Sequence, residues 1–173
     1  DNLNLFEKSE DIEKLAFEVP DAGGVEFVPA LTGLGAPYWN PEARGLLCGL
    51  TRGTLKSHIA RATLEAMALQ NAEVLLVMQK DLGKKLKKLK VDGGASQNNL
   101  LMQIQSDYLN ASISRPSNVE TTSLGAAYLA GLGVGIWKDL SDIKKIWKED
   151  RSFESHMTAK DRETRFKKWR KAI

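Results

Sequence analysis

The chain has 173 residues, of which 42% are hydrophobic and 27% charged, with a net charge of +3; these values fit one folded domain and exclude a disordered polypeptide. No apolar run approaches the ~20 residues that cross a bilayer, and the N-terminal stretch is acidic, so we expect a cytoplasmic setting. Cys48 is the only cysteine, and His58 and His156 lie far apart, so the sequence predicts neither an internal disulfide nor a metal site.

In chain order, the pattern predicts a helix over 9–18, strands over 25–28 and 45–50, a helix over 57–83, a strand over 86–92, a helix over 96–109, a strand over 111–115 and a helix over 122–131. Ser57 and Ser96 are the expected N-caps of their helices, and Gly83 is the expected end of the long one. Alternating strands and helices are typical of an α/β fold with a parallel sheet. Because two parallel strands are too few for a stable sheet, either the first two strands join it or further strands precede Asp1.

The segment 31–44 is too rich in glycine and proline for regular structure. It nevertheless carries Tyr38 and Trp39, two large rings that gain stability from burial. We therefore expect an ordered surface loop with at least one of the two rings substantially buried.

The C-terminal segment 138–173 is rich in lysine and arginine, but acidic residues are interleaved with them. Such a tail could contact nucleic acid. Trp147, Phe166 and Trp169 instead favour amphipathic helices that dock on the rest of the protein, so we predict a helical C-terminal extension and no nucleic-acid partner.

Gly93 and Gly94 join a predicted strand to a predicted helix. Two glycines there leave no side chain to hold a flat ligand away from the backbone, and they permit the dihedrals of a sharp turn. The free N–H groups of the helix that follows point at whatever lies above the glycines, and Asn98 adds an amide. The junction suits a nucleotide, although a plain tight turn has the same pattern.

Several motifs together resemble the FGGY family of carbohydrate kinases. Residues 45–65 resemble the family's second signature, and residues 91–96 resemble the adenosine motif that sugar kinases share with actin and the Hsp70 chaperones. Residues 123–131 are similar to the helix that follows in these kinases. Residues 27–45 are closer to the glycerol-phosphorylating members than to those that act on xylulose or gluconate. The resemblance is dense over residues 23–137.

The resemblance implies that residues 1–173 are a C-terminal, nucleotide-binding domain of the ribonuclease H-like or actin-like ATPase fold, here incomplete, with 138–173 as its helical extension. It implies an enzyme that uses ATP and Mg²⁺ to phosphorylate glycerol, and that forms a homo-oligomer. The phosphate loop, the catalytic carboxylate, the glycerol-binding residues and most of the magnesium site are expected upstream of Asp1, so no catalytic residue is predicted in this chain.

Four cofactor-binding residues follow from the resemblance. Gly93 and Gly94 would form the turn that supports adenosine, Gly94 and Ala95 would face the base or ribose through backbone atoms, and Asn98 would contact the adenine edge. Asp92, just before this turn, is expected to have a structural role rather than to act as the base.

Three alternatives stay open. The chain could belong to another sugar or polyol kinase of the same family, to an actin-like nucleotide-switched scaffold or chaperone, or to an interaction domain that binds no nucleotide. Residues 45–65 favour a kinase over a scaffold, because the adenosine motif alone is common to both classes.

Overall fold

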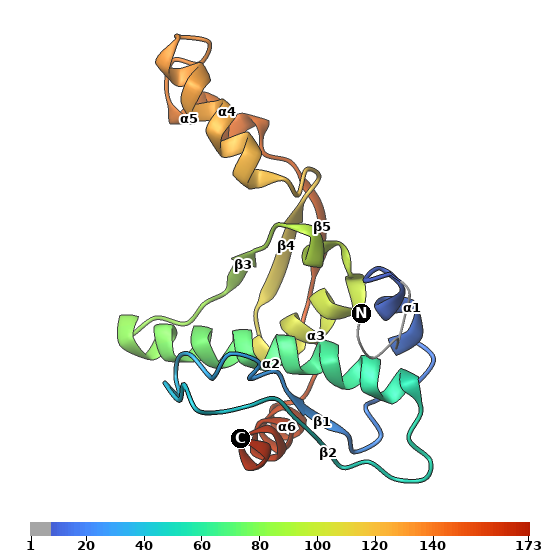
Figure 1. Ribbon diagram of the computed structural model, residues 1–173. Helices are drawn as coiled ribbons and strands as arrows, with labels where there is room; N and C mark the ends of the chain where they lie inside the picture. The colour runs from blue at the N-terminus through green and yellow to red at the C-terminus, as the bar shows by residue number, and fades with distance from the viewer. Residues whose placement is uncertain (1–7) are drawn as a thin grey trace.

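The structure is a computed structural model that describes residues 8–173. Figure 1 shows two small sheets and several helices arranged around one long central helix. In chain order the elements are α1 (Asp11–Ala16), β1 (Glu26–Val28), β2 (Leu46–Cys48), α2 (Lys56–Leu82), β3 (Lys88–Lys90), the 3-10 turn η1 (Gly94–Gln97), α3 (Asn99–Leu109), β4 (Ser112–Pro116), α4 (Thr121–Gly133), α5 (Leu140–Ile146), β5 (Glu149–Phe153) and α6 (Ala159–Ala172). The predicted α/β class is confirmed.

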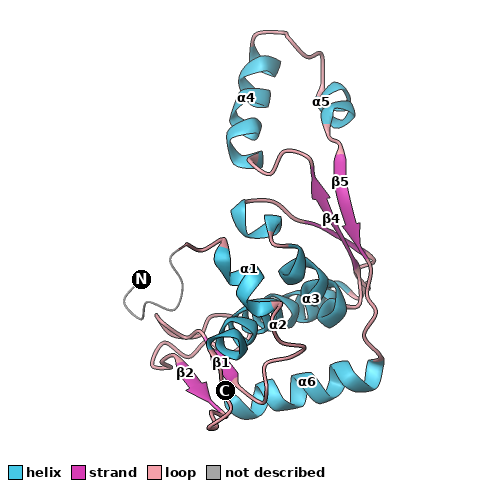
Figure 2. Cartoon of the chain, turned by 90° about the vertical axis from the view of Figure 1, so that its right-hand side faces the viewer, coloured by secondary structure: helices cyan, strands magenta, loops and turns pink. Residues whose placement is uncertain are grey.

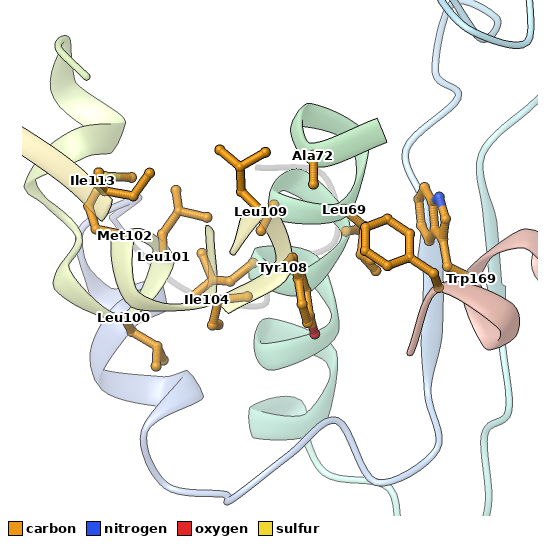
Figure 3. Packing of buried hydrophobic residues seen from close by; sticks show 14 of the residues in the cluster. Leu69, Ala72, Leu100, Leu101, Met102, Ile104, Tyr108, Leu109, Ile113 and Trp169 are labelled. Carbon is orange, nitrogen blue, oxygen red and sulfur yellow. The ribbon is translucent and has the colours of Figure 1, made fainter. Parts of the chain in front are cut away.

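The long helix α2 is the centre of the core. Small alanines on it allow its neighbours to approach closely, and Leu69 on the same helix is fully buried. Figure 3 shows Leu69 and Ala72 beside Tyr108 and Leu109 of α3, with Trp169 of α6 on the other side. Full burial of a leucine side chain stabilises a fold by ~1.5–3 kcal/mol. The packing against α2 therefore holds α3 in position, and the candidate site lies at the N-terminus of α3.

The predicted C-terminal end of α2 is confirmed, but its predicted N-cap is wrong. Gly83 ends the helix in the left-handed conformation, with φ of 62°, as predicted. Ser57 is not the N-cap: the helix is preceded by Leu55, whose N–H donates to Nδ1 of His58. The Ser57 hydroxyl instead donates to Glu18 at 2.5 Å, so a tertiary contact replaces the expected local one.

The second sheet has the order β3, β4, β5. β3 and β4 are parallel and joined through α3, as predicted. β5 pairs antiparallel with β4, so the segment 138–173, predicted as a helical extension, contains a strand over Glu149–Phe153 as well as α5 and α6. β1 and β2 form a separate antiparallel hairpin and do not extend this sheet. The alternating apolar pattern that marks a strand is weak in β5, where only Phe153 is buried.

The last helix, α6, docks on the core as predicted. Trp169 is 0% exposed, and Phe166 is also buried, with its ring edge-on to Tyr108. Arg165 forms ion pairs with Glu26 of β1 and Glu65 of α2. Burial disfavours the charge of Arg165, but these partners raise its pKa above the ordinary value. The basic C-terminus thus serves largely as a docking element.

The loop between β1 and β2 buries one of its two rings. Tyr38 is half-buried, and its hydroxyl donates to Glu73 of α2 at 2.5 Å. Trp39 is 76% exposed. The expectation of at least one buried ring is met by Tyr38 alone, because only that ring has a buried acceptor within reach.

α4 and α5 extend away from the rest of the chain (Figures 1 and 2). Leu129 of α4 is 70% exposed, and Val134 and Ile136, which follow it in the chain, are exposed to a similar degree. Gly131 is the buried residue of α4, and a Cβ there would collide with Trp137. None of the helices among residues 8–173 is both long and apolar enough to cross a membrane.

Candidate functional site

The turn after β3 has the geometry that its glycines permit. Gly93 has φ of 77° and ψ of 171°, a conformation that other residues adopt only under strain. Its N–H donates to the carbonyl of Val119 at 2.9 Å, which ties the turn to the segment between β4 and α4. Gly94 and Ala95 follow in η1 and are exposed. A Cβ on Gly94 would meet nothing within 4 Å, so the chain leaves open space above this glycine.

The N-cap expected at Ser96 is formed by Asn98 instead. The Ser96 side chain is buried and donates to the carbonyl of Gly93 at 2.7 Å, which closes η1. Asn98 is the N-cap of α3, because its Oδ1 accepts from the N–H of Leu101 at 2.8 Å. The expected cap at Ser96 is therefore wrong, since the 3-10 turn moves the start of the α-helix toward the C-terminus. With Oδ1 used by the cap, the Nδ2 group of Asn98 is the donor left for a ligand.

A groove of about 580 Å³ lies above this turn. Its lining comes from the turn, from α1 and the residues just before it, and from apolar side chains of α2 and α3. The lining residues are Ser9, Glu10, Ile12, Glu13, Leu64, Met67, Gly94, Ala95, Gln97, Asn98 and Leu101. The structure thus brings Gly94, Ala95 and Asn98 together at one groove, whereas Gly93 supports the turn from behind.

The chemistry of the groove is apolar and acidic. Its lining includes the carboxylates of Glu10 and Glu13 but no lysine or arginine. A phosphate group would meet negative charge here without a countercharge. A flat, uncharged heterocycle can bury its faces against Leu64, Met67 and Leu101 and bond to Asn98 at its edge.

Arg115 is a supporting residue that the sequence did not reveal. It lies at the end of β4, and its Nη1 donates to the carbonyls of Ser96 (2.9 Å) and Gln97 (3.2 Å) and to Oδ1 of Asn99 (3.1 Å). Asp150 of β5 holds the other side of the guanidinium at 2.7 Å. Arg115 therefore fixes the turn from below. In the sequence, the only indication of this role was that Arg115 lies at the carboxyl end of a predicted parallel strand. The carboxyl ends of parallel strands lie at the same edge of a sheet.

Glu13 is the second residue that sequence reasoning missed. Its Oε1 accepts from the N–H of Leu100, in the first turn of α3, at 3.0 Å. Nothing local in the sequence relates the two positions, which only the packing of α1 against α3 brings together.

Asp92 accepts a hydrogen bond from the Thr121 hydroxyl at the start of α4. Within the described part of the chain, no three His, Cys, Asp or Glu side chains gather as they would around a metal ion.

Comparison with known proteins identifies the family. Residues 2–134 match the family described as "FGGY family of carbohydrate kinases, C-terminal domain". Among curated relatives, the glycerol kinase of Bdellovibrio bacteriovorus is 61% identical over the whole chain, and glycerol kinase 2 of Sulfolobus acidocaldarius is 55% identical. The chain spans 35% of the length of either relative.

Solved structures agree on the fold. The Plasmodium falciparum glycerol kinase with ADP matches 99% of this chain with a TM-score of 0.89 and 38% identity, and the chain covers 34% of that protein. A ligand-bound xylulose kinase from Lactobacillus acidophilus matches 98% of the chain with a TM-score of 0.76 and 26% identity, again over 34% of its own length. The predicted actin-like ATPase fold is confirmed. The chain belongs to the FGGY family of carbohydrate kinases and matches its C-terminal domain.

Proposed function

We propose that this chain is the ATP-binding part of a glycerol kinase, which transfers the γ-phosphoryl group of ATP to glycerol and yields glycerol 3-phosphate. Curated relatives with 53–61% identity are named glycerol kinases, and a similar solved structure is a glycerol kinase with ADP. The chain spans 35% of the first relative's length, and the proposed activity is that of the whole protein. We place the enzyme in the cytoplasm, as a homo-oligomer that acts on these small molecules.

The observation that carries the proposal is the groove at the Gly94 turn. Its apolar base and its acidic lining, free of lysine and arginine, fit the adenosine half of ATP rather than the phosphates. In this arrangement, the backbone of Gly94 and Ala95 faces the base or ribose. The Nδ2 group of Asn98 donates to an acceptor on the adenine edge.

The phosphates then leave the groove toward parts of the protein outside this chain. Phosphoryl transfer depends on positioning and on charge stabilisation by cations around the phosphates. We assign Mg²⁺, the phosphate-binding groups, the base and the glycerol site to those other parts. The role of this chain is to hold the nucleoside at a fixed place, so that the γ-phosphate meets the acceptor hydroxyl.

Gly94→Val in the full-length protein tests the assignment. Gly94 has room for a Cβ, so the backbone tolerates the change, but the branched side chain enters the groove. We expect the KM for ATP to rise at least about tenfold, equivalent to ~1.4 kcal/mol, with the KM for glycerol within about twofold. Gly53→Val is the matched control, because Gly53 is exposed, has room for a Cβ and lies outside the groove.

Two results would contradict the proposal. One is an unchanged KM for ATP in a folded Gly94→Val protein, which would remove the nucleotide from this groove. The other concerns the acceptor: the enzyme should phosphorylate glycerol with a much higher kcat/KM than xylulose or gluconate. A preference for either sugar substrate would assign the chain to another branch of the family.

A further inference from the structure

Helix α1 is attached to the first turn of α3 through one side chain. Glu13 is half-buried, and its Oε1 accepts from the N–H of Leu100 at 3.0 Å. α1 has six residues and packs against α2 and α3, as Figure 2 shows. A helix this short has little stability of its own, so its position depends on such tertiary contacts.

The same contact closes the N-terminus of α3. Leu100 N–H donates to Glu13 and Leu101 N–H donates to Asn98, so side-chain oxygens take two of the donors that begin the helix. One of these oxygens belongs to a carboxylate, which favours the positive end of the helix dipole. The first turn of α3 is thereby completed from within the protein, and it does not act as an anion-binding end.

Glu13 also lines the groove, together with Gly94 and Ala95. Ile12, its neighbour on α1, lines the same groove and packs against the core. Loss of the Glu13 carboxylate would remove the hydrogen bond that joins α1 to the N-terminus of α3, beside the place assigned to the nucleoside. A residue of the groove lining is thus held by a hydrogen bond to the first turn of α3.

We propose that Glu13 is a positioning residue for the nucleotide: by holding α1 against the N-terminus of α3, it keeps the α1 part of the lining in place around the adenosine half. This inference rests on the proposed function. It concerns the nucleoside half only, since the phosphate half lies outside the groove.

The test is competitive inhibition against ATP in the full-length protein, with adenosine and with pyrophosphate as separate inhibitors. Three variants are compared with the unmodified protein: Glu13→Ala, Glu13→Gln and Glu18→Ala. Glutamine keeps an oxygen that accepts from Leu100. Glu18→Ala is the matched control, because Glu18 also makes a tertiary bond, to Ser57, but does not line the groove.

We expect Glu13→Ala to raise the inhibition constant of adenosine about five- to tenfold, which corresponds to the loss of about one hydrogen bond. Glu13→Gln should restore it to within about twofold, and Glu18→Ala should leave it unchanged. The constant for pyrophosphate should stay within about twofold in every variant. A merely structural role for Glu13 would not separate the two inhibitors.

Three results would overturn the role of Glu13: no change in the adenosine constant on Glu13→Ala, a parallel rise in both constants, or an equal rise on Glu18→Ala. Failure of the proposed function looks different. If adenosine does not compete with ATP in the unmodified protein, and Gly94→Val leaves the KM for ATP unchanged, the groove itself is not the nucleotide site and the role of Glu13 falls with it.

Discussion

The Glu73→Ala variant should loosen the C-terminal helix α6 and the loop that carries Tyr38. The Glu73 side chain is 4% exposed and accepts three hydrogen bonds. Its Oε2 accepts from the Tyr38 hydroxyl (2.5 Å) and from Nε1 of Trp169 (2.9 Å), and its Oε1 accepts from Nε of Arg170 (2.8 Å). Burial and the bond to Glu73 raise the pKa of Tyr38, so its hydroxyl stays protonated and donates.

The size of the effect follows from the exposure of each donor. Trp169 is fully buried, and its N–H left without an acceptor costs ~1–3 kcal/mol. The half-buried Tyr38 hydroxyl can turn toward water, so its loss costs ~1 kcal/mol. The Arg170 side chain is 58% exposed, and its ion pair contributes less than ~1 kcal/mol. We expect about 3 kcal/mol in total, most of it from Trp169.

Hydrogen exchange of peptides from α6, followed by mass spectrometry, measures this local opening in the full-length protein. About 3 kcal/mol corresponds to exchange roughly two orders of magnitude faster in α6. Arg170→Ala is the control, since it removes only the exposed partner, and it should accelerate exchange less than about fivefold. The reasoning is refuted if Glu73→Ala and Arg170→Ala give the same exchange rates, because the buried hydrogen bond from Trp169 would then contribute nothing measurable to the stability of α6.

Two further predictions concern the turn, and a third concerns the activity of the isolated chain. Gly93→Ala should destabilise the protein by ~1–2 kcal/mol, because a φ of 77° strains any residue other than glycine. Its melting temperature should fall, whereas that of Gly94→Val should not. Equal melting temperatures for the two variants would contradict the strain at Gly93. Asn98→Asp keeps the cap on Leu101 but removes the Nδ2 donor, so titration with ATP should show several-fold weaker binding with unchanged stability, while Asn98→Ala should lose both. The 173-residue chain alone should not turn over glycerol with MgATP; a rate above background would disprove our assignment of the catalytic groups.

The sequence by itself determined most of the helices and strands and the position of the turn at Gly93 and Gly94. Glycine and apolar periodicity act locally, so the end of α2 at Gly83 and the parallel pair β3 and β4 were predictable. The two glycines marked the turn, and Gly93 adopts a positive φ of 77°, which favours that residue type.

Only the three-dimensional structure decided which partners the polar groups find. The sequence predicted Ser57 and Ser96 as N-caps of their helices. The Ser57 hydroxyl instead donates to Glu18, and the Ser96 hydroxyl donates to the Gly93 carbonyl. Arg115 and Glu13 reach the site from β4 and α1.

β5 shows the same limit. It is a strand because β4 offers an edge for it to pair with, whereas its own residues are mostly exposed and carry little apolar pattern. Hydrogen bonds and pairings between segments far apart in the chain depend on how helices and strands pack, and local residue patterns do not encode that packing. Sequence therefore located the turn at Gly93 and Gly94, and the fold supplied the polar contacts that hold it.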